Sequence, residues 1–239
     1  HLLGYGPAGL GVDSLGSVYV TDFTSNLLRI YDPSDFSSAT NTVAIPGGVT
    51  TGVGLLSNGD AVIATAGGGV FRYDGEVVTQ FTEHPIAQLA SSQVAVDSSD
   101  NVYIGHGIGF SDFAFKFSST GSLLGTFEVT DKMVGGTGKG STFGTNPSGV
   151  AIDRDGNVII AALGRSNPGD PGGERGGAFR FNSSGTAYSE IATATKAFSS
   201  ATIVPNATVF KTFVYHPEWA GAGSSQDSAK IVHLETANS

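Results

Sequence analysis

Short apolar runs recur in pairs along the chain, and the two runs of each pair are separated by a tight turn of Gly, Asn, Asp or Ser. The same ten-residue pattern occurs at residues 11–20, 54–63, 95–104 and 151–160, and a degraded copy starts at Ile203. Gly, Asn and Asp tolerate the positive φ angles that tight hairpin turns require. The pattern therefore predicts β-hairpins rather than helices.

A second pattern follows each hairpin, namely an apolar strand that ends in an aromatic and a polar turn residue. Its first four copies end at Tyr31-Asp32, Tyr73-Asp74, Phe117-Ser118 and Phe181-Asn182, and the fifth is Val232-His233-Leu234. A further strand follows the first four copies, at residues 42–45, 77–81, 123–129 and 187–191. Units of four antiparallel strands are typical of propeller blades. We expect an all-β protein, a five-bladed β-propeller of four-stranded antiparallel blades.

The first strand of each unit is expected to line the central axis. Small residues stand at equivalent positions of four first strands, at Gly11, Gly54, Ala95 and Ala151. They permit close backbone approach where the blades crowd together. The residues that follow them are apolar, namely Val12, Leu55, Val96, Ile152 and, in the fifth unit, Val204. We expect these to be buried between blades.

The ends of the chain bear on how the ring closes. The fifth unit ends after its third strand, near Leu234. The opening residues 1–6 are similar to residues 123–129, the fourth strand of the third unit. We expect this N-terminal strand to close the last blade. The result is one domain over residues 1–239, with blades at approximately 7–47, 48–86, 87–145, 146–197 and 198–239 plus 1–6.

Two alternative folds stay open, a larger propeller of which this chain is a part and a β-sandwich with hairpins of similar spacing. The first residues match neither a signal peptide nor an initiator start, so we also expect a processed or truncated N-terminal end.

The blade pattern resembles the NHL repeat. Residues 146–161 match that repeat best, residues 7–22 and 93–104 match well, residues 51–64 match loosely and residues 198–211 match poorly. The resemblance covers most of the chain and implies a propeller. It specifies an architecture rather than an activity.

Charge and composition exclude several classes of partner. The net charge is −9, because 12 basic residues are scattered among 21 acidic ones. Nucleic acid and an anionic membrane surface are therefore not expected partners. There is no cysteine and no apolar run long enough to span a bilayer. The few charges and the Ser-, Thr- and Gly-rich loops lead us to expect an extracellular or periplasmic location.

The predicted topology collects the long loops on one face of the propeller. Loops 165–177 and 216–228 join second to third strands, and 130–146 connects two blades. The same face carries the candidate binding residues, which are Asp22, His106, His216, Glu218 and Trp219. Long loops on a rigid scaffold are common binding sites, so we expect a binding face here.

The remaining motifs favour structural roles. Asp13, Asp97 and Asp153 end first strands, where an Asp that hydrogen-bonds to its own turn explains the recurrence better than a calcium loop does. No metal site and no cofactor are predicted. Two glycosylation sequons begin at Asn182 and Asn206, both in predicted turns.

The sequence is compatible with two functions. The first is a non-catalytic binding or scaffold module for a protein, a glycan or another copy of itself. The second is a metal-dependent lyase or lactone hydrolase with a site at the mouth of the central channel, as in the streptogramin lyase and gluconolactonase groups, whose propellers are related. No stretch of this sequence matches their active-site motifs. An enzyme would draw on Asp22, His106, His216 and Glu218.

Overall fold

The computed structural model describes residues 7–22, 24–83, 93–106, 113–129, 147–162, 176–194, 200–203, 211–215 and 231–235. These residues form strands and turns, and they contain no helix that could cross a membrane. Every pairing between neighbouring strands is antiparallel. The prediction of an all-β chain is confirmed.

Four sheets have four strands each. The first blade consists of β1 (Pro7–Val12), β2 (Val18–Asp22), β3 (Leu27–Tyr31) and β4 (Asn41–Ala44). The second consists of β5 (Thr50–Leu55), β6 (Ala61–Thr65), β7 (Val70–Tyr73) and β8 (Val78–Gln80). The third consists of β9 (Val94–Val96), β10 (Val102–Ile104), β11 (Phe113–Phe117) and β12 (Leu123–Glu128). The fourth consists of β13 (Pro147–Ile152), β14 (Val158–Ala162), β15 (Gly176–Phe181) and β16 (Tyr188–Ala194).

The prediction of five four-stranded blades is wrong, because the residues that the structure describes form four. The last sheet has three strands, β17 (Ser200–Ile203), β18 (Lys211–Tyr215) and β19 (Ile231–Glu235). The N-terminal strand of the described residues, β1, pairs with β2 inside the first blade and does not close the last sheet. Residues 1–6, to which the prediction gave that role, lie outside the described residues.

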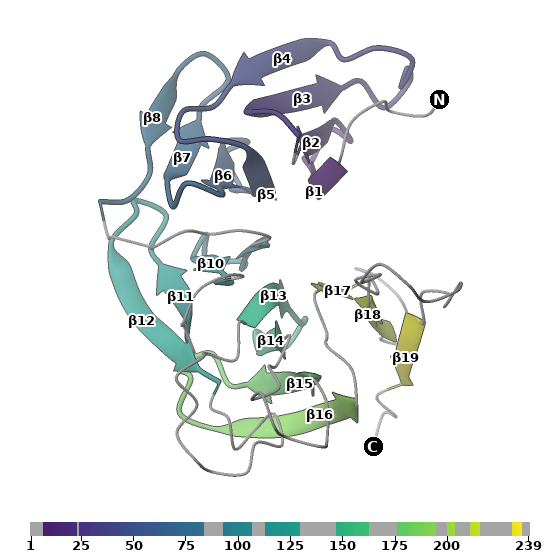
Figure 1. Ribbon diagram of the computed structural model, residues 1–239, viewed down its shortest axis with the longest axis vertical. Helices are drawn as coiled ribbons and strands as arrows, with labels where there is room; N and C mark the ends of the chain where they lie inside the picture. The colour runs from purple at the N-terminus through teal and green to yellow at the C-terminus, as the bar shows by residue number, and fades with distance from the viewer. Residues whose placement is uncertain are drawn as a thin grey trace, which may run out of the picture.

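The sheets are arranged radially (Figure 1). The strands β1, β5 and β13 lie nearest a common axis, and β4, β8, β12 and β16 lie at the periphery. Neighbouring inner strands contact one another in the order β1, β5, β9, β13 and β17. This arrangement is a β-propeller, with an axial channel lined by first strands.

The turns explain why these hairpins form. Gly16, Gly59 and Gly156 occupy the turns after the first strands with φ angles of 88°, 91° and 79°. Asp100 occupies the corresponding turn of the third blade with a φ of 60°. Glycine adopts this left-handed region without steric cost, and Asp is one of the few other residues that tolerate it.

The cores lie between blades rather than within one. Side chains on one face of the first blade, such as Leu28, pack against Val53 and Ile63 of the second. The same holds between the second and third blades, and between the third and fourth, where Phe127 packs among Ile160 and Phe179. Each such buried side chain contributes about 1.5–3 kcal/mol. Each blade is therefore stabilised mainly by its neighbours.

Gly54 faces the next blade. A Cβ on Gly54 would lie 2.9 Å from Val94 Cγ1 and 2.9 Å from Val96 Cγ2, so the neighbouring strand leaves no room for a side chain at this position. The prediction that Val12 is buried between blades is wrong, because this residue is 54% exposed.

Candidate functional site

The second strands end, and the first strands begin, on one face of the propeller. We call this the channel face and define it by Asp22, Thr50, Gln93, His106 and Pro147. The strands β1, β5 and β13 each carry a register shift at this end, where an extra residue interrupts the pairing. Such bulges interrupt the ladder of backbone hydrogen bonds, and they are frequent next to binding sites.

Asp22, the last residue of β2, is 1% exposed. Its Oδ1 accepts hydrogen bonds from the Thr24 backbone N at 2.9 Å and from Thr24 Oγ1 at 2.6 Å. Its Oδ2 lies 2.7 Å from the guanidinium of Arg29 on β3, in an ion pair. Both oxygens of the carboxylate therefore bind residues of the first blade, to which Asp22 itself belongs.

The pKa of Asp22 reflects these neighbours. Burial alone would raise the pKa, because a charged carboxylate is costly to remove from water. Hydrogen bonds from Thr24 and Arg29 outweigh burial and lower the pKa of Asp22 to about 2. A carboxylate that binds protons this weakly is a poor general base near neutral pH.

The backbone of Asp22 also ties two blades together. Its N–H donates to Thr50 Oγ1 at 2.9 Å, and Thr50 is the first residue of β5. The Thr50 hydroxyl in turn donates to the carbonyl of Leu27 at 2.9 Å.

His106 occupies the corresponding junction between the third and fourth blades. It follows β10 by two residues and is 5% exposed. Its backbone N–H donates to the carbonyl of Pro147, the first residue of β13, at 2.8 Å. Its ring packs edge-on against Phe115 at a centroid distance of 6.3 Å. Asp22 and His106 therefore have the same backbone role in different blades.

The other predicted site residues lie outside the described residues. They are His216, Glu218, Trp219 and the sequon residue Asn206, together with the loops 130–146 and 216–228. The loop predicted at 165–177 lies outside as far as residue 175, and Gly176 begins β15. Within the part of the chain that the structure describes, no three His, Asp or Glu residues are grouped closely enough to hold a metal ion.

Asn182 lies in the turn after β15. Its Oδ1 accepts a hydrogen bond from the Thr186 backbone N at 2.9 Å, and its Nδ2 donates to Thr186 Oγ1 at 3.0 Å. The side chain therefore stabilises the turn. Glycosylation at Asn182 stays a prediction.

The recurring aspartates at the ends of first strands stabilise their turns, as predicted. Asp13 Oδ1 accepts hydrogen bonds from the backbone N of Leu15 and Ser17, and Asp97 and Asp153 make the equivalent bonds. Asp153 also pairs with Arg180 at 2.7 Å. The sequence analysis did not predict ion pairs of this kind. Their signal is a basic residue directly before the aromatic residue that ends the third strand of a blade, as at Arg72 and Arg180.

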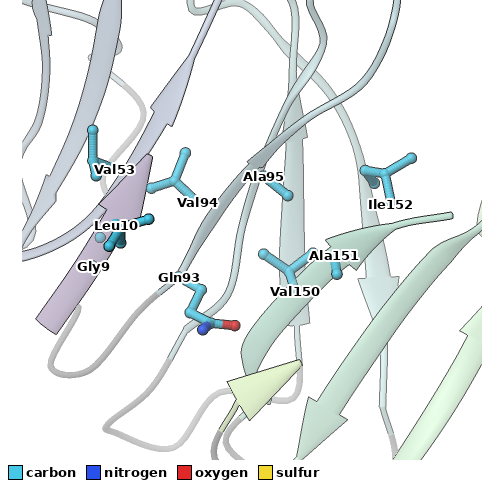
Figure 2. A pocket seen from close by; sticks show the side chains of 10 residues that line it. Gly9, Leu10, Val53, Gln93, Val94, Ala95, Val150, Ala151 and Ile152 are labelled. Carbon is cyan, nitrogen blue, oxygen red and sulfur yellow. The ribbon is translucent and has the colours of Figure 1, made fainter. Parts of the chain in front are cut away.

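The channel contains a cavity of about 220 Å³ near the channel face (Figure 2). Its walls come from β1, β5, β9 with the preceding Gln93, and β13. The side chains that line it are apolar except for one, and they include Leu10, Val53, Val94, Val150 and Ile152. The exception is Gln93, whose backbone carbonyl accepts a hydrogen bond from the backbone N of Gly105 at 3.2 Å, next to His106.

The sequence analysis did not predict this cavity. The sequence feature that corresponds to it is an apolar residue near the start of a first strand, such as Leu10 or Val150. A second cavity of about 320 Å³ lies around the turns that follow the first strands, where the carboxylates of Asp13, Asp97 and Asp100 are used by hydrogen bonds within or between turns.

Comparisons with known proteins identify the fold only. No protein-family model matches the sequence, and no curated protein matches it. Among solved structures, a streptogramin B lyase is 12% identical with a TM-score of 0.62, over 96% of this chain and 69% of the lyase. The hydrazine synthase of Kuenenia stuttgartiensis is 11% identical with a TM-score of 0.64, over 99% of this chain and 67% of that one. YCF48 bound to the D1 peptide is 11% identical with a TM-score of 0.52, over 88% of this chain and 61% of that one.

These likenesses establish a β-propeller. The narrower prediction of NHL repeats stays a prediction, because no family model supports it. The similar structures include a lyase as well as a protein that binds a peptide, so fold alone does not decide between the two functions.

Proposed function

We propose that this chain is a non-catalytic binding module that acts outside the cytoplasm and binds a protein partner on its channel face. The observation that carries the proposal is the open cavity at this face, which apolar side chains, Gln93 and polar backbone groups line together. Ligand sites usually combine apolar side chains with a few placed polar groups.

The polar residues of the channel face support binding rather than catalysis. Asp22 is held by Arg29 and Thr24 and has a low pKa, and its backbone joins two blades. The backbone N–H of His106 joins the third and fourth blades through Pro147. Residues that maintain the scaffold at these junctions are poorly suited to change position or protonation during a reaction.

A peptide-bound propeller among the similar structures supports the choice of a protein partner. The few charged residues and the Gly- and Ser-rich loops support a location outside the cytoplasm. A glycan or a second copy of this chain are the other partners that the composition permits, and the experiment distinguishes them.

The test is panning of a random peptide library on phage against the purified chain, followed by hydrogen–deuterium exchange with the selected peptides. The proposal predicts slower exchange in β1, β5 and β9 when peptide is bound. Protection confined to the peripheral strands β12 and β16, or failure to select any peptide, would contradict it. Glycan-array binding or concentration-dependent dimerisation instead would identify the other partners.

The same preparation tests the enzyme alternative. A stoichiometric metal in the purified chain that is lost on His106→Ala, while the variant stays folded, would support a metal-dependent enzyme and contradict the binding module.

A further inference from the structure

One face of the first blade carries large apolar side chains that are exposed to solvent. A Cβ on Gly11 would meet the side chain of Leu55, so Gly11 faces the second blade. Side chains alternate between the two faces of a strand, and β1 is regular from Leu10 to Val12. These two residues therefore lie on the opposite face, where Leu10 is 66% exposed and Val12 is 54% exposed. We call this surface the free face and define it by Leu10 and Val12.

The equivalent face of each later four-stranded blade is covered by the blade before it. The residues that correspond to Leu10 in the repeat are Val53, Val94 and Val150. Val53 is 4% exposed and packs in one cluster with Leu28 of the first blade. Val94 packs against buried residues of the second blade, and Val150, which is 3% exposed, packs with residues of the third. The surface that covers this face elsewhere in the molecule is therefore the sheet of an adjacent blade.

The contacts between blades begin at the first blade and end at the last sheet. Neighbouring inner strands contact one another in the order β1, β5, β9, β13 and β17, so the first blade and the last sheet are the two ends of this series (Figure 1). The last sheet of a second copy can continue the series, because it can take the place before β1 that β1 takes before β5. Burial of an exposed apolar face favours such a contact.

Both ends of the series lack net charge, although the chain as a whole has a net charge of −9. Asp22 and Arg29 are the only charged residues of β1, β2 and β3, and they form an ion pair. With His233 neutral, Lys211 and Glu235 are the only charged residues of β17, β18 and β19, and these two are opposite each other in the register of β18 and β19. Copies that repel one another elsewhere can therefore approach through these two ends.

We infer that the chain self-associates head to tail, and that the last sheet of one copy covers the free face of the next copy. The contact continues the packing between blades, with Leu10 and Val12 in the position that Val53 and Leu55 have against the first blade. Because two different surfaces meet, the assembly closes as a ring or extends as a filament. The inference goes beyond the proposed function and does not depend on it.

Sedimentation velocity of the full chain, at concentrations between roughly 5 and 500 μM, tests the inference. We expect the average mass to rise from one copy toward two or more copies as the concentration increases. A mass of one copy over this whole range would overturn the inference.

Matched variants locate the surface. Val12→Glu places an unpaired carboxylate in the contact, and it is expected to weaken association by roughly tenfold or more. Leu124→Glu is the control, because Leu124 lies on the peripheral strand β12, is 55% exposed, and receives the same added charge. It should leave association unchanged within about twofold. Equal effects of the two variants would overturn the inference.

Hydrogen–deuterium exchange of the native chain locates the contact even if Val12→Glu does not fold. We expect slower exchange in β1 and in β17, β18 and β19 at the highest concentration than at the lowest. Slower exchange in β1 without the last sheet would indicate contact between two first blades. Protection of both that does not depend on concentration would indicate closure by the chain's own last sheet. Either result would overturn the inference.

The outcomes separate this inference from the proposed function. Selected peptides that bind a chain whose mass stays at one copy would contradict this inference alone. Association through the free face, with no peptide selected from the library, would contradict the proposed function alone.

Discussion

The guanidinium of Arg29 lies 2.7 Å from the carboxylate of Asp22, in an ion pair whose two side chains are 12% and 1% exposed. Removing one partner of a buried pair leaves an uncompensated charge. We expect Arg29→Met to lower the free energy of unfolding by about 3 kcal/mol. Urea denaturation followed by circular dichroism measures this.

The control for that variant is Arg154→Gln. Arg154 and Asp155 lie 3.8 Å apart with both side chains more than half exposed, so the loss should stay below about 0.5 kcal/mol. Equal losses in the two variants would show that the Asp22–Arg29 pair does not stabilise the first blade.

The low pKa of Asp22 predicts a dependence of stability on pH. The pKa is about 2 in the folded chain and about 4 in an unfolded one. The resulting stabilisation is complete above about pH 4 and is lost as the pH falls toward about 2, a total of about 2 kcal/mol. The stability difference between the native chain and Asp22→Asn, measured by urea denaturation, should shrink by this amount over the same pH range. A difference that stays constant with pH would contradict the assignment.

Glycines at blade contacts should resist substitution, whereas glycines with open space around the Cβ position should not. A Cβ on Gly9 would lie 2.7 Å from Thr21 Oγ1, whereas one on Gly125 of β12 has no heavy atom within 4 Å. Gly9→Ala is expected to cost about 1–3 kcal/mol. Gly125→Ala should be neutral or stabilise by about 0.5 kcal/mol. Thermal unfolding of both variants measures the contrast, and a harmless Gly9→Ala would mean that the blades lie farther apart.

The hydroxyl of Tyr103 donates to Asp97 Oδ2 at 2.9 Å beneath a fully buried ring. Burial, together with the negative charge of Asp97, raises the pKa of Tyr103 well above its ordinary range. Asp97→Ala leaves this hydroxyl without an acceptor, at a cost of about 1–3 kcal/mol beyond the lost turn bonds. Adding Tyr103→Phe should recover about 1 kcal/mol in a double-mutant cycle. Strict additivity of the two substitutions would contradict the coupling.

The hairpins could be predicted because their determinants are local. The glycines at 16, 59 and 156 supply the positive φ of each turn, and period-2 burial fixes the register beside it. The number of four-stranded blades could not be predicted in this way. It depends on pairing between distant segments, and a likeness between residues 1–6 and 123–129 does not specify a pairing partner.

The candidate site could be predicted only in part, because some of its determinants are not local. The repeat pattern places Asp22 and His106 at equivalent positions of two blades. Their backbone hydrogen bonds to Thr50 and Pro147, however, depend on how neighbouring blades pack. The cavity was missed because a bulge between Pro7 and Leu10 shifts the register of β1. Because of this shift, a strict alternation of side chains between the two faces of the sheet, counted from Gly11, does not show which side chains face the channel.

The most direct measurement of the central claim is hydrogen–deuterium exchange of the chain with and without a peptide selected by phage panning. We predict slower exchange in β1, β5 and β9 when the peptide is bound. Protection confined to the peripheral strands β12 and β16 would contradict the claim.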